Sequence, residues 1–187
     1  MGIALSWVAV KGLQPDEVLS RLELAHTDEE SSYPFEGVVA HPLPDGGFLV
    51  AARGCGHRII RADSMARLSA ACQALSCDIE EHVGFVASAL WEDGRQVWEV
   101  RYESDDDPEN IFCKGQVPAR VHELLAQVEP MDSENFEGHY HMDIPLILAK
   151  EFSGYRHDED DTSFEATPFE TLKDLRGKTS WWRSLWQ

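Results

Sequence analysis

Residues 77–91 read CDIEEHVGFVASALW, and this stretch decides the fold. Apolar side chains recur at the odd positions, with Ile79, Val83, Phe85 and Trp91 as the largest of them. A period of two is typical of a β-strand with one buried face. A strand of this length is unusual, so we predict a bend at Gly84.

Turn residues on both sides of this stretch predict antiparallel pairing. Glu92-Asp93-Gly94-Arg95 forms a hairpin turn, after which residues 96–103 return with apolar side chains on one face. A second hairpin is expected over residues 37–53, around Pro44-Asp45-Gly46-Gly47. Hairpins of this kind predict a mainly antiparallel sheet.

The rest of the chain supplies helices and a buried strand. Residues 3–10 form an apolar, β-branched run, and residues 26–34 a polar loop. Helical periodicity appears at about 15–24, 64–75, 118–128 and 144–152, and a further strand at 111–116. We therefore predict an α+β fold, a mainly antiparallel sheet with helices packed on one face. One interpretation is a doubled β-α-β-β unit, over residues 3–53 and 64–103, with a short strand at 58–61 opening the second copy.

The domain organisation follows from a change in composition. We predict an α+β domain at residues 1–153, followed by a C-terminal arm at 154–187 that is acidic, then tryptophan-rich. The arm is expected to be irregular and to pack on the domain or on a neighbouring copy.

Charge is the strongest functional indication. The chain has 34 acidic and 16 basic side chains, a formal net charge of −18. Residues 103–161 alone carry 16 acids and 4 bases. Nucleic acid is excluded as a ligand, because phosphate binding needs a basic surface.

Length and composition set further limits. The 187 residues are 43% hydrophobic, which is ordinary for a folded domain. No apolar run approaches the roughly 20 residues of a membrane helix, and the N-terminus lacks a signal peptide pattern. The four cysteines are too few and too irregularly spaced for a disulfide framework or a zinc site. We expect a cytoplasmic protein with reduced thiols and no cofactor.

Catalytic motifs are absent from the sequence. There is no GxSxG, GxxxxGK or GxGxxG pattern. Gly54-Cys55-Gly56-His57 places a thiol next to an imidazole, but catalytic pairs are usually assembled from distant positions. An enzyme is therefore not the favoured class.

Glu81 is the most unusual single residue. By alternation it falls on the apolar side of the long strand, where a carboxylate without a partner would have a raised pKa. It is our candidate buried carboxylate. The alternative is a strand end or bulge that places Glu81 in solvent.

A metal site is the main alternative to a purely structural role. His139, His141 and Asp143 follow one another at every second residue, so their side chains share one side of an extended segment. His157 could add a ligand. The competing interpretation is a polar turn in which Asp143 caps the helix that Pro145 opens.

Two segments are candidates for contact with a partner. Asp105, Asp106 and Asp107 form an acidic loop that resembles a calcium loop only in composition. Trp181, Trp182 and Trp186 form an apolar patch if they are exposed, and such patches often mark contact surfaces.

Several short segments together resemble an uncharacterised family of bacterial proteins. They are residues 6–12, Val18-Leu19, Glu81-His82-Val83, the hairpin at 91–98 and Gly154-Tyr155-Arg156-His157-Asp158. The resemblance covers about residues 3–160. It implies a bacterial cytoplasmic protein and supplies no catalytic residue.

These observations lead to three functional hypotheses. The leading one is a non-catalytic acidic protein-binding module, for example an inhibitor or immunity-type protein that covers a basic partner. The alternative is a metal-binding protein or small metal-assisted hydrolase that uses His139, His141 and Asp143. The third is a homo-oligomer joined through the C-terminal tryptophans.

Overall fold

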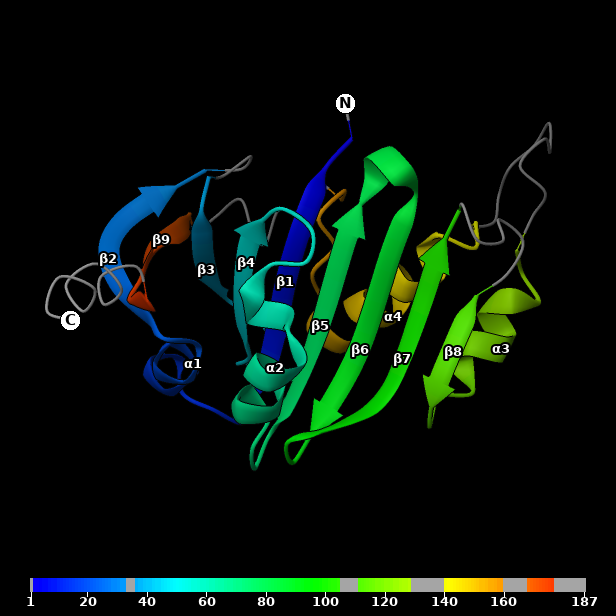
Figure 1. Ribbon diagram of the computed structural model, residues 1–187, viewed down its shortest axis with the longest axis horizontal. Helices are drawn as coiled ribbons and strands as arrows, with labels where there is room; N and C mark the ends of the chain where they lie inside the picture. The colour runs from blue at the N-terminus through cyan, green and yellow to red at the C-terminus, as the bar shows by residue number, and fades with distance from the viewer. Residues whose placement is uncertain (1, 33–35, 105–110, 129–139, 160–167, 177–187) are drawn as a thin grey trace, which may run out of the picture.

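The computed structural model describes residues 2–32, 36–104, 111–128, 140–159 and 168–176. Its core is one antiparallel sheet of nine strands in the order β2-β9-β3-β4-β1-β5-β6-β7-β8 (Figure 1). The strands are β1 (Ala4–Lys11), β2 (Leu24–Ser31), β3 (Val38–Pro42), β4 (Phe48–Arg53), β5 (Gln73–Glu80), β6 (Phe85–Glu92), β7 (Arg95–Glu103), β8 (Phe112–Gly115) and β9 (Phe169–Asp174). The expected α+β class and antiparallel sheet are confirmed.

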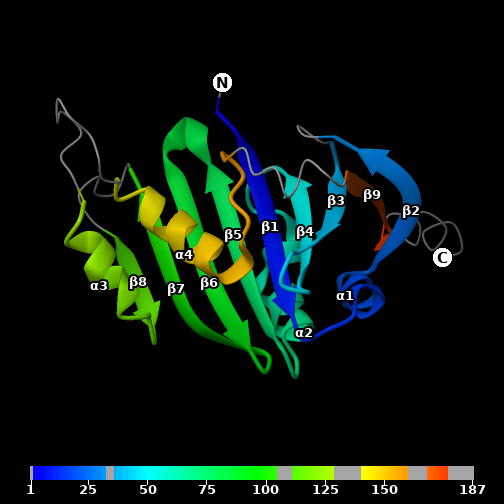
Figure 2. The ribbon, with the colours of Figure 1, turned by 180° about the vertical axis from the view of Figure 1, so that it is seen from behind.

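Helices cover both faces of the sheet rather than one. They are α1 (Pro15–Leu22), α2 (Ala62–Leu68), α3 (Arg120–Leu125) and α4 (Asp143–Ser153). Helices α3 and α4 pack on one face, which we call the α4 face, while α1 and α2 lie on the opposite α2 face (Figures 1 and 2). Two separate apolar clusters result, one on each side of the sheet.

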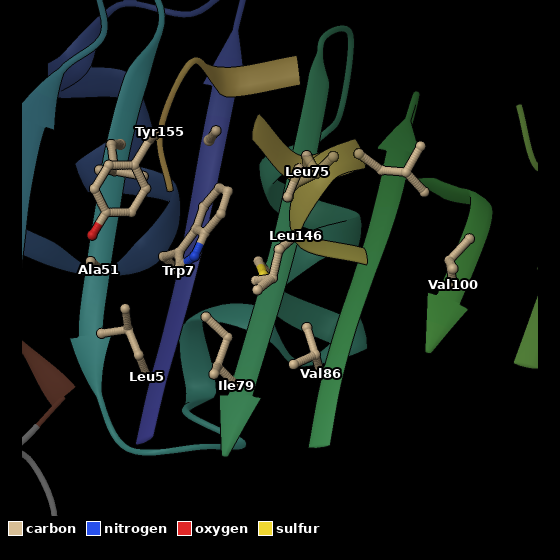
Figure 3. Close-up of a cluster of buried hydrophobic side chains, with 14 of the residues drawn as sticks. Leu5, Trp7, Ala51, Leu75, Ile79, Val86, Val100, Leu146 and Tyr155 are labelled. Carbon is tan, nitrogen blue, oxygen red and sulfur yellow. The ribbon is translucent and has the colours of Figure 1, made fainter. Parts of the chain in front are cut away.

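The central strand β1 explains why both faces need covering. Leu5 and Trp7 belong to the cluster on the α4 face, whereas Val8 and Val10 belong to the cluster on the α2 face. A continuous apolar strand is buried on both sides. Figure 3 shows Trp7 and its neighbours under α4, and Tyr155 meets the Trp7 ring edge-on at 5.4 Å between centroids.

The long strand expected at residues 77–91 is a hairpin. Strand β5 ends at Glu80, the 3-10 helix η2 (Glu81–Val83) follows, and Gly84 takes a left-handed conformation with φ of 62° before β6 begins. In the sequence, apolar side chains continue at the odd positions across the turn, but the odd positions of β5 and β6 lie on opposite faces of the sheet. Ile79 lies in the α4-face cluster, whereas Trp91 packs against the α2-face cluster.

The two other hairpin turns form where the sequence predicts them. In the β6–β7 turn Asp93 and Gly94 have φ of 49° and 76°, as a type I′ turn requires. In the β3–β4 turn Gly46 has φ of 84°.

Three local predictions were wrong. Residues 58–61 do not form a strand, since Arg58–Ile60 is the 3-10 helix η1, so the second β-α-β-β copy lacks its first strand. The helix expected to reach residue 75 ends at Leu68, and Ala71 follows with φ of 59°. Residues 26–31 are not a loop but part of β2.

Strand β9 lies between β2 and β3 and hydrogen-bonds to both. Residues 169–174 of the expected irregular arm are thus part of the sheet. The division into a domain at 1–153 and an arm at 154–187 stays a prediction.

Candidate functional site

A buried histidine and a carboxylate meet at the end of β5. His157 has a side chain only 1% exposed, and its Nε2 lies 3.1 Å from Oε1 of Glu81, which is 29% exposed. The other carboxylate oxygen of Glu81 accepts a hydrogen bond from the Ile3 backbone N–H at 2.8 Å. Glu81 therefore connects the N-terminal strand to the segment after α4.

Arg156 extends this contact into a network of charges. Its guanidinium donates to Asp143 at 2.6 Å and to both carboxylate oxygens of Asp158 at 2.7 and 3.0 Å. Burial acts to raise the pKa of Asp158, but the hydrogen bonds and charge of Arg156 outweigh it, so that pKa lies below its ordinary value. We call Glu81, Asp143, Arg156, His157 and Asp158 the arm cluster.

His157 is the most deeply buried member of the arm cluster. His157 is closed to solvent, and its Nδ1 is buried without a hydrogen bond among the described residues. The Asp158 carboxylate is 3.9 Å from that nitrogen. A general base must reach the proton it removes, which a fully covered ring cannot do.

The predicted metal ligands are only partly within the described chain. Asp143 accepts hydrogen bonds from Arg156 and from the Tyr140 backbone N–H, so its carboxylate is already occupied. His157 pairs with Glu81, and His139 lies outside the described residues. In the part of the chain that the structure describes, no group of three or more His, Cys, Asp or Glu side chains could hold a metal ion.

A second cluster surrounds Asp78 on the α2 face. Its carboxylate accepts hydrogen bonds from Ser6 Oγ at 2.7 Å, from the Gly56 N–H at 2.9 Å and from Cys55 Sγ at 3.3 Å. Ser6 Oγ in turn accepts from the His57 N–H at 3.0 Å. These contacts fasten the loop after β4 to β1 and β5.

This environment suppresses the chemistry considered for Cys55. Burial, followed by the charge of Asp78, raises the pKa of the Cys55 thiol to about 12. Burial lowers the pKa of His57, and its Nδ1 accepts from the Ile59 N–H at 3.5 Å as a cap of η1. The nucleophile is the thiolate, so the raised pKa disfavours nucleophilic chemistry at Cys55.

A third group of acids, which sequence reasoning missed, lies on edge strand β2 and beside it on α1 and β9. His26 Nδ1 lies 2.7 Å from Glu170, and its Nε2 lies 3.2 Å from Asp16. Glu170 also accepts hydrogen bonds from the backbone N–H groups of Thr27 and Asp28, where Asp28 has φ of 58°.

Strand β2 itself carries three consecutive exposed acids, Asp28, Glu29 and Glu30. Glu30 lies directly opposite Glu170 in the ladder. We call these residues the β2 surface: Asp16, Asp28, Glu29, Glu30 and Glu170 with His26. A polar acidic run between a helix and a proline was the only sequence feature that could have indicated it.

The partner-contact candidates cannot be placed. Asp105, Asp106 and Asp107, together with Trp181, Trp182 and Trp186, lie outside the described residues. No described helix is long and apolar enough to span a membrane.

Comparisons with protein-family models, with curated proteins and with solved structures each found no match to this chain. The resemblance to an uncharacterised bacterial family therefore stays a prediction.

Proposed function

We propose that this protein is a non-catalytic, acidic, cytoplasmic binding module that covers a basic protein partner, as an inhibitor or immunity-type protein does. The observation that carries the proposal is the β2 surface. Glu30 stands opposite Glu170 in the ladder, and like charges directly opposite each other destabilise a sheet. His26 and two backbone N–H groups already stabilise the charge of Glu170, so a cationic partner would mainly offset the charge of Glu30 beside it.

Support also comes from the way other acids are paired. Asp174 is neutralised by Arg58 at 2.8 Å, and Glu151 by Arg120 at 2.9 Å. Within the described chain, the ion pairs of the β2 surface involve only His26. Its hydrogen bond to Glu170, opposed by slight burial, raises the pKa of His26, which reflects the negative potential there.

The charge of the whole chain favours the same kind of partner. A formal net charge of −18 accelerates and orients association with a basic protein, and this effect weakens as salt screens it. The alternative, a metal-binding protein using His139, His141 and Asp143, rests on sequence spacing alone.

Charge neutralisation at the β2 surface tests the proposal. The variant Asp28→Asn, Glu29→Gln, Glu30→Gln removes three exposed charges, and asparagine tolerates the left-handed backbone at position 28. The matched control is the variant Glu36→Gln, Glu92→Gln, Asp93→Asn, which removes three exposed acids elsewhere that also lack an ion pair within the described chain.

Binding is measured to an oligolysine peptide and to the basic proteins recovered from the native host at low salt. We expect the β2 variant to lose about tenfold or more in affinity for both, and the control to lose clearly less. Equal losses in the two variants, or no basic protein recovered at low salt, would overturn the proposal.

A further inference from the structure

Strand β8 ends the sheet opposite β2, with all four residues exposed (Figure 1). The ladder with β7 shows which backbone groups of β8 bond to β7 and which point away from the sheet. Trp98 lies opposite Gly115, and the Gln116 N–H donates to the Val97 carbonyl at 2.9 Å. Because hydrogen-bonded pairs alternate along an antiparallel ladder, Lys114 faces its backbone groups toward β7, and Cys113 faces its own away from the sheet.

The two edges of the sheet differ in how they are protected. Strand β2 carries a bulge and three consecutive acids, Asp28 to Glu30, which are typical devices against edge-to-edge pairing. Strand β8 has a regular ladder and a single charged residue, Lys114. Helix α3, which follows β8, packs on the α4 face through Val121 and Leu124.

Phe112 adds an exposed aromatic ring to this edge. It is 48% exposed, and the Arg101 guanidinium lies over the ring at 4.8 Å from its centroid. Phe112 and Lys114 share the α2 face of the sheet with Arg101, since Arg101 pairs with Phe112 and Glu99 with Lys114 in the ladder. On that face no described helix covers β7 or β8 (Figure 1).

We propose that a second copy of this chain pairs antiparallel with β8, about a two-fold axis that passes beside Cys113. In this register the two Cys113 residues exchange backbone hydrogen bonds, and Phe112 of each copy lies opposite Lys114 of the other. An ammonium group over an aromatic ring is favourable, as Arg101 already shows within the chain.

The neighbouring symmetric registers are less favourable. The outward-facing groups restrict the two-fold axis to positions beside residue 112, 113 or 114. An axis at Lys114 would place the two ammonium groups opposite each other, which is repulsive. An axis at Phe112 would leave Lys114 without the aromatic partner.

Salt separates this dimer from the binding of a basic protein. Two chains of net charge −18 repel each other overall, so the dimer should strengthen as salt rises. The proposed basic partner should instead bind more weakly. A four-residue strand also buries little surface, so the dimer should dissociate on dilution.

The test uses the full chain in sedimentation at low and high salt. We expect a concentration-dependent dimer for the wild type and for Cys113→Ser. We expect about a tenfold or larger increase in the dissociation constant for Cys113→Pro, which removes the outward N–H and with it two hydrogen bonds per dimer, while the inward-facing bonds of Phe112 and Lys114 to β7 are kept. Equal dimerisation of the serine and proline variants, or a monomer at all salts, would overturn the proposal.

Oxidation gives an independent measurement if the proline variant fails to fold. Residues exchanging hydrogen bonds across an antiparallel pair have Cα atoms about 5.5 Å apart, within the usual range for a disulfide. Diamide takes two electrons and two protons as the sulfur–sulfur bond forms, and burial raises the pKa of the Cys113 thiol, so mildly alkaline buffer is used. Cross-linked dimer should form in Cys55→Ser and be absent in Cys113→Ser. The reverse pattern, or no cross-linking in Cys55→Ser, would contradict the register.

Discussion

Removal of the Glu81 side chain should destabilise the protein well beyond an ordinary surface substitution. Glu81→Ala removes the acceptor of the Ile3 N–H at 2.8 Å and the partner of His157 at 3.1 Å. The Ile3 amide can find water, but the His157 ring is 1% exposed and cannot. An unsatisfied buried polar group costs about 1–3 kcal/mol, so we expect a loss of about 2–3 kcal/mol in the free energy of unfolding.

The assay is urea unfolding near neutral pH, followed by a double-mutant cycle. The control is Glu80→Ala at the adjacent position. Among the described residues its carboxylate contacts only exposed His82, through the ring and a long bond from the backbone N–H, so its loss should cost less than about 1 kcal/mol. Glu81→Ala, His157→Gln and the double variant should give a coupling energy of about 1–2 kcal/mol. Equal effects of the two alanine variants, or no coupling with His157, would refute the anchoring role of the arm cluster.

Three other substitutions test single features of the structure. Gly84→Ala should cost about 2 kcal/mol in a thermal or urea unfolding assay, because φ is 62° and the added Cβ would lie 2.6 Å from Ser104 Oγ. Cys55, with its pKa raised to about 12, should alkylate near pH 8 at least about a hundredfold more slowly than in the unfolded chain, and Asp78→Asn should accelerate the reaction, as read by mass spectrometry. The raised pKa of His26 contributes stability that is fully present below the pKa of the unfolded chain and is lost as pH rises through the pKa of the folded protein. His26→Gln should therefore lower the free energy of unfolding more at about pH 5.5 than at about pH 8.5. The opposite trend would contradict the His26 ion pairs.

Local features of the fold could be predicted because short-range chemistry determines them. Asp93-Gly94 forms a type I′ turn for backbone reasons that no distant contact can override easily, and the apolar run of β1 is buried on both faces. The facing of Phe85 to Trp91 was not predictable in the same way. Apolar residues stay at odd positions on both sides of the four-residue turn although these positions change face, so alternation in the sequence alone does not distinguish one long strand from a hairpin.

Long-range pairing explains what the sequence could not indicate. Strand β2 contains Asp28, Glu29 and Glu30, and acidic residues of this kind are depleted in strands. It is a strand because β9, some 140 residues later, hydrogen-bonds along it, with Leu172 opposite His26. The candidate site followed the same pattern. Glu81 was identified as unusual and His157 as a possible ligand, but their mutual contact depends on the path of the chain after α4.

Three carboxylates in or beside the sheet perform one common structural task. Asp78 accepts from the Gly56 N–H, Glu81 from the Ile3 N–H, and Glu170 from the N–H groups of Thr27 and Asp28. Each satisfies backbone donors in or beside an irregular segment, donors that would otherwise be costly to leave unpaired. Part of the negative charge of this protein is therefore architectural.

Other acids have no such task, and those on β2 are consecutive. Asp28, Glu29 and Glu30 project from an edge strand, and no side-chain ion pair within the described chain neutralises them. Protection of the edge against aggregation would be served equally well by lysine. The three consecutive acids instead make this edge strongly negative, with Glu30 directly opposite Glu170. This negative charge is the reason for placing the proposed basic partner at this edge rather than elsewhere on an acidic protein.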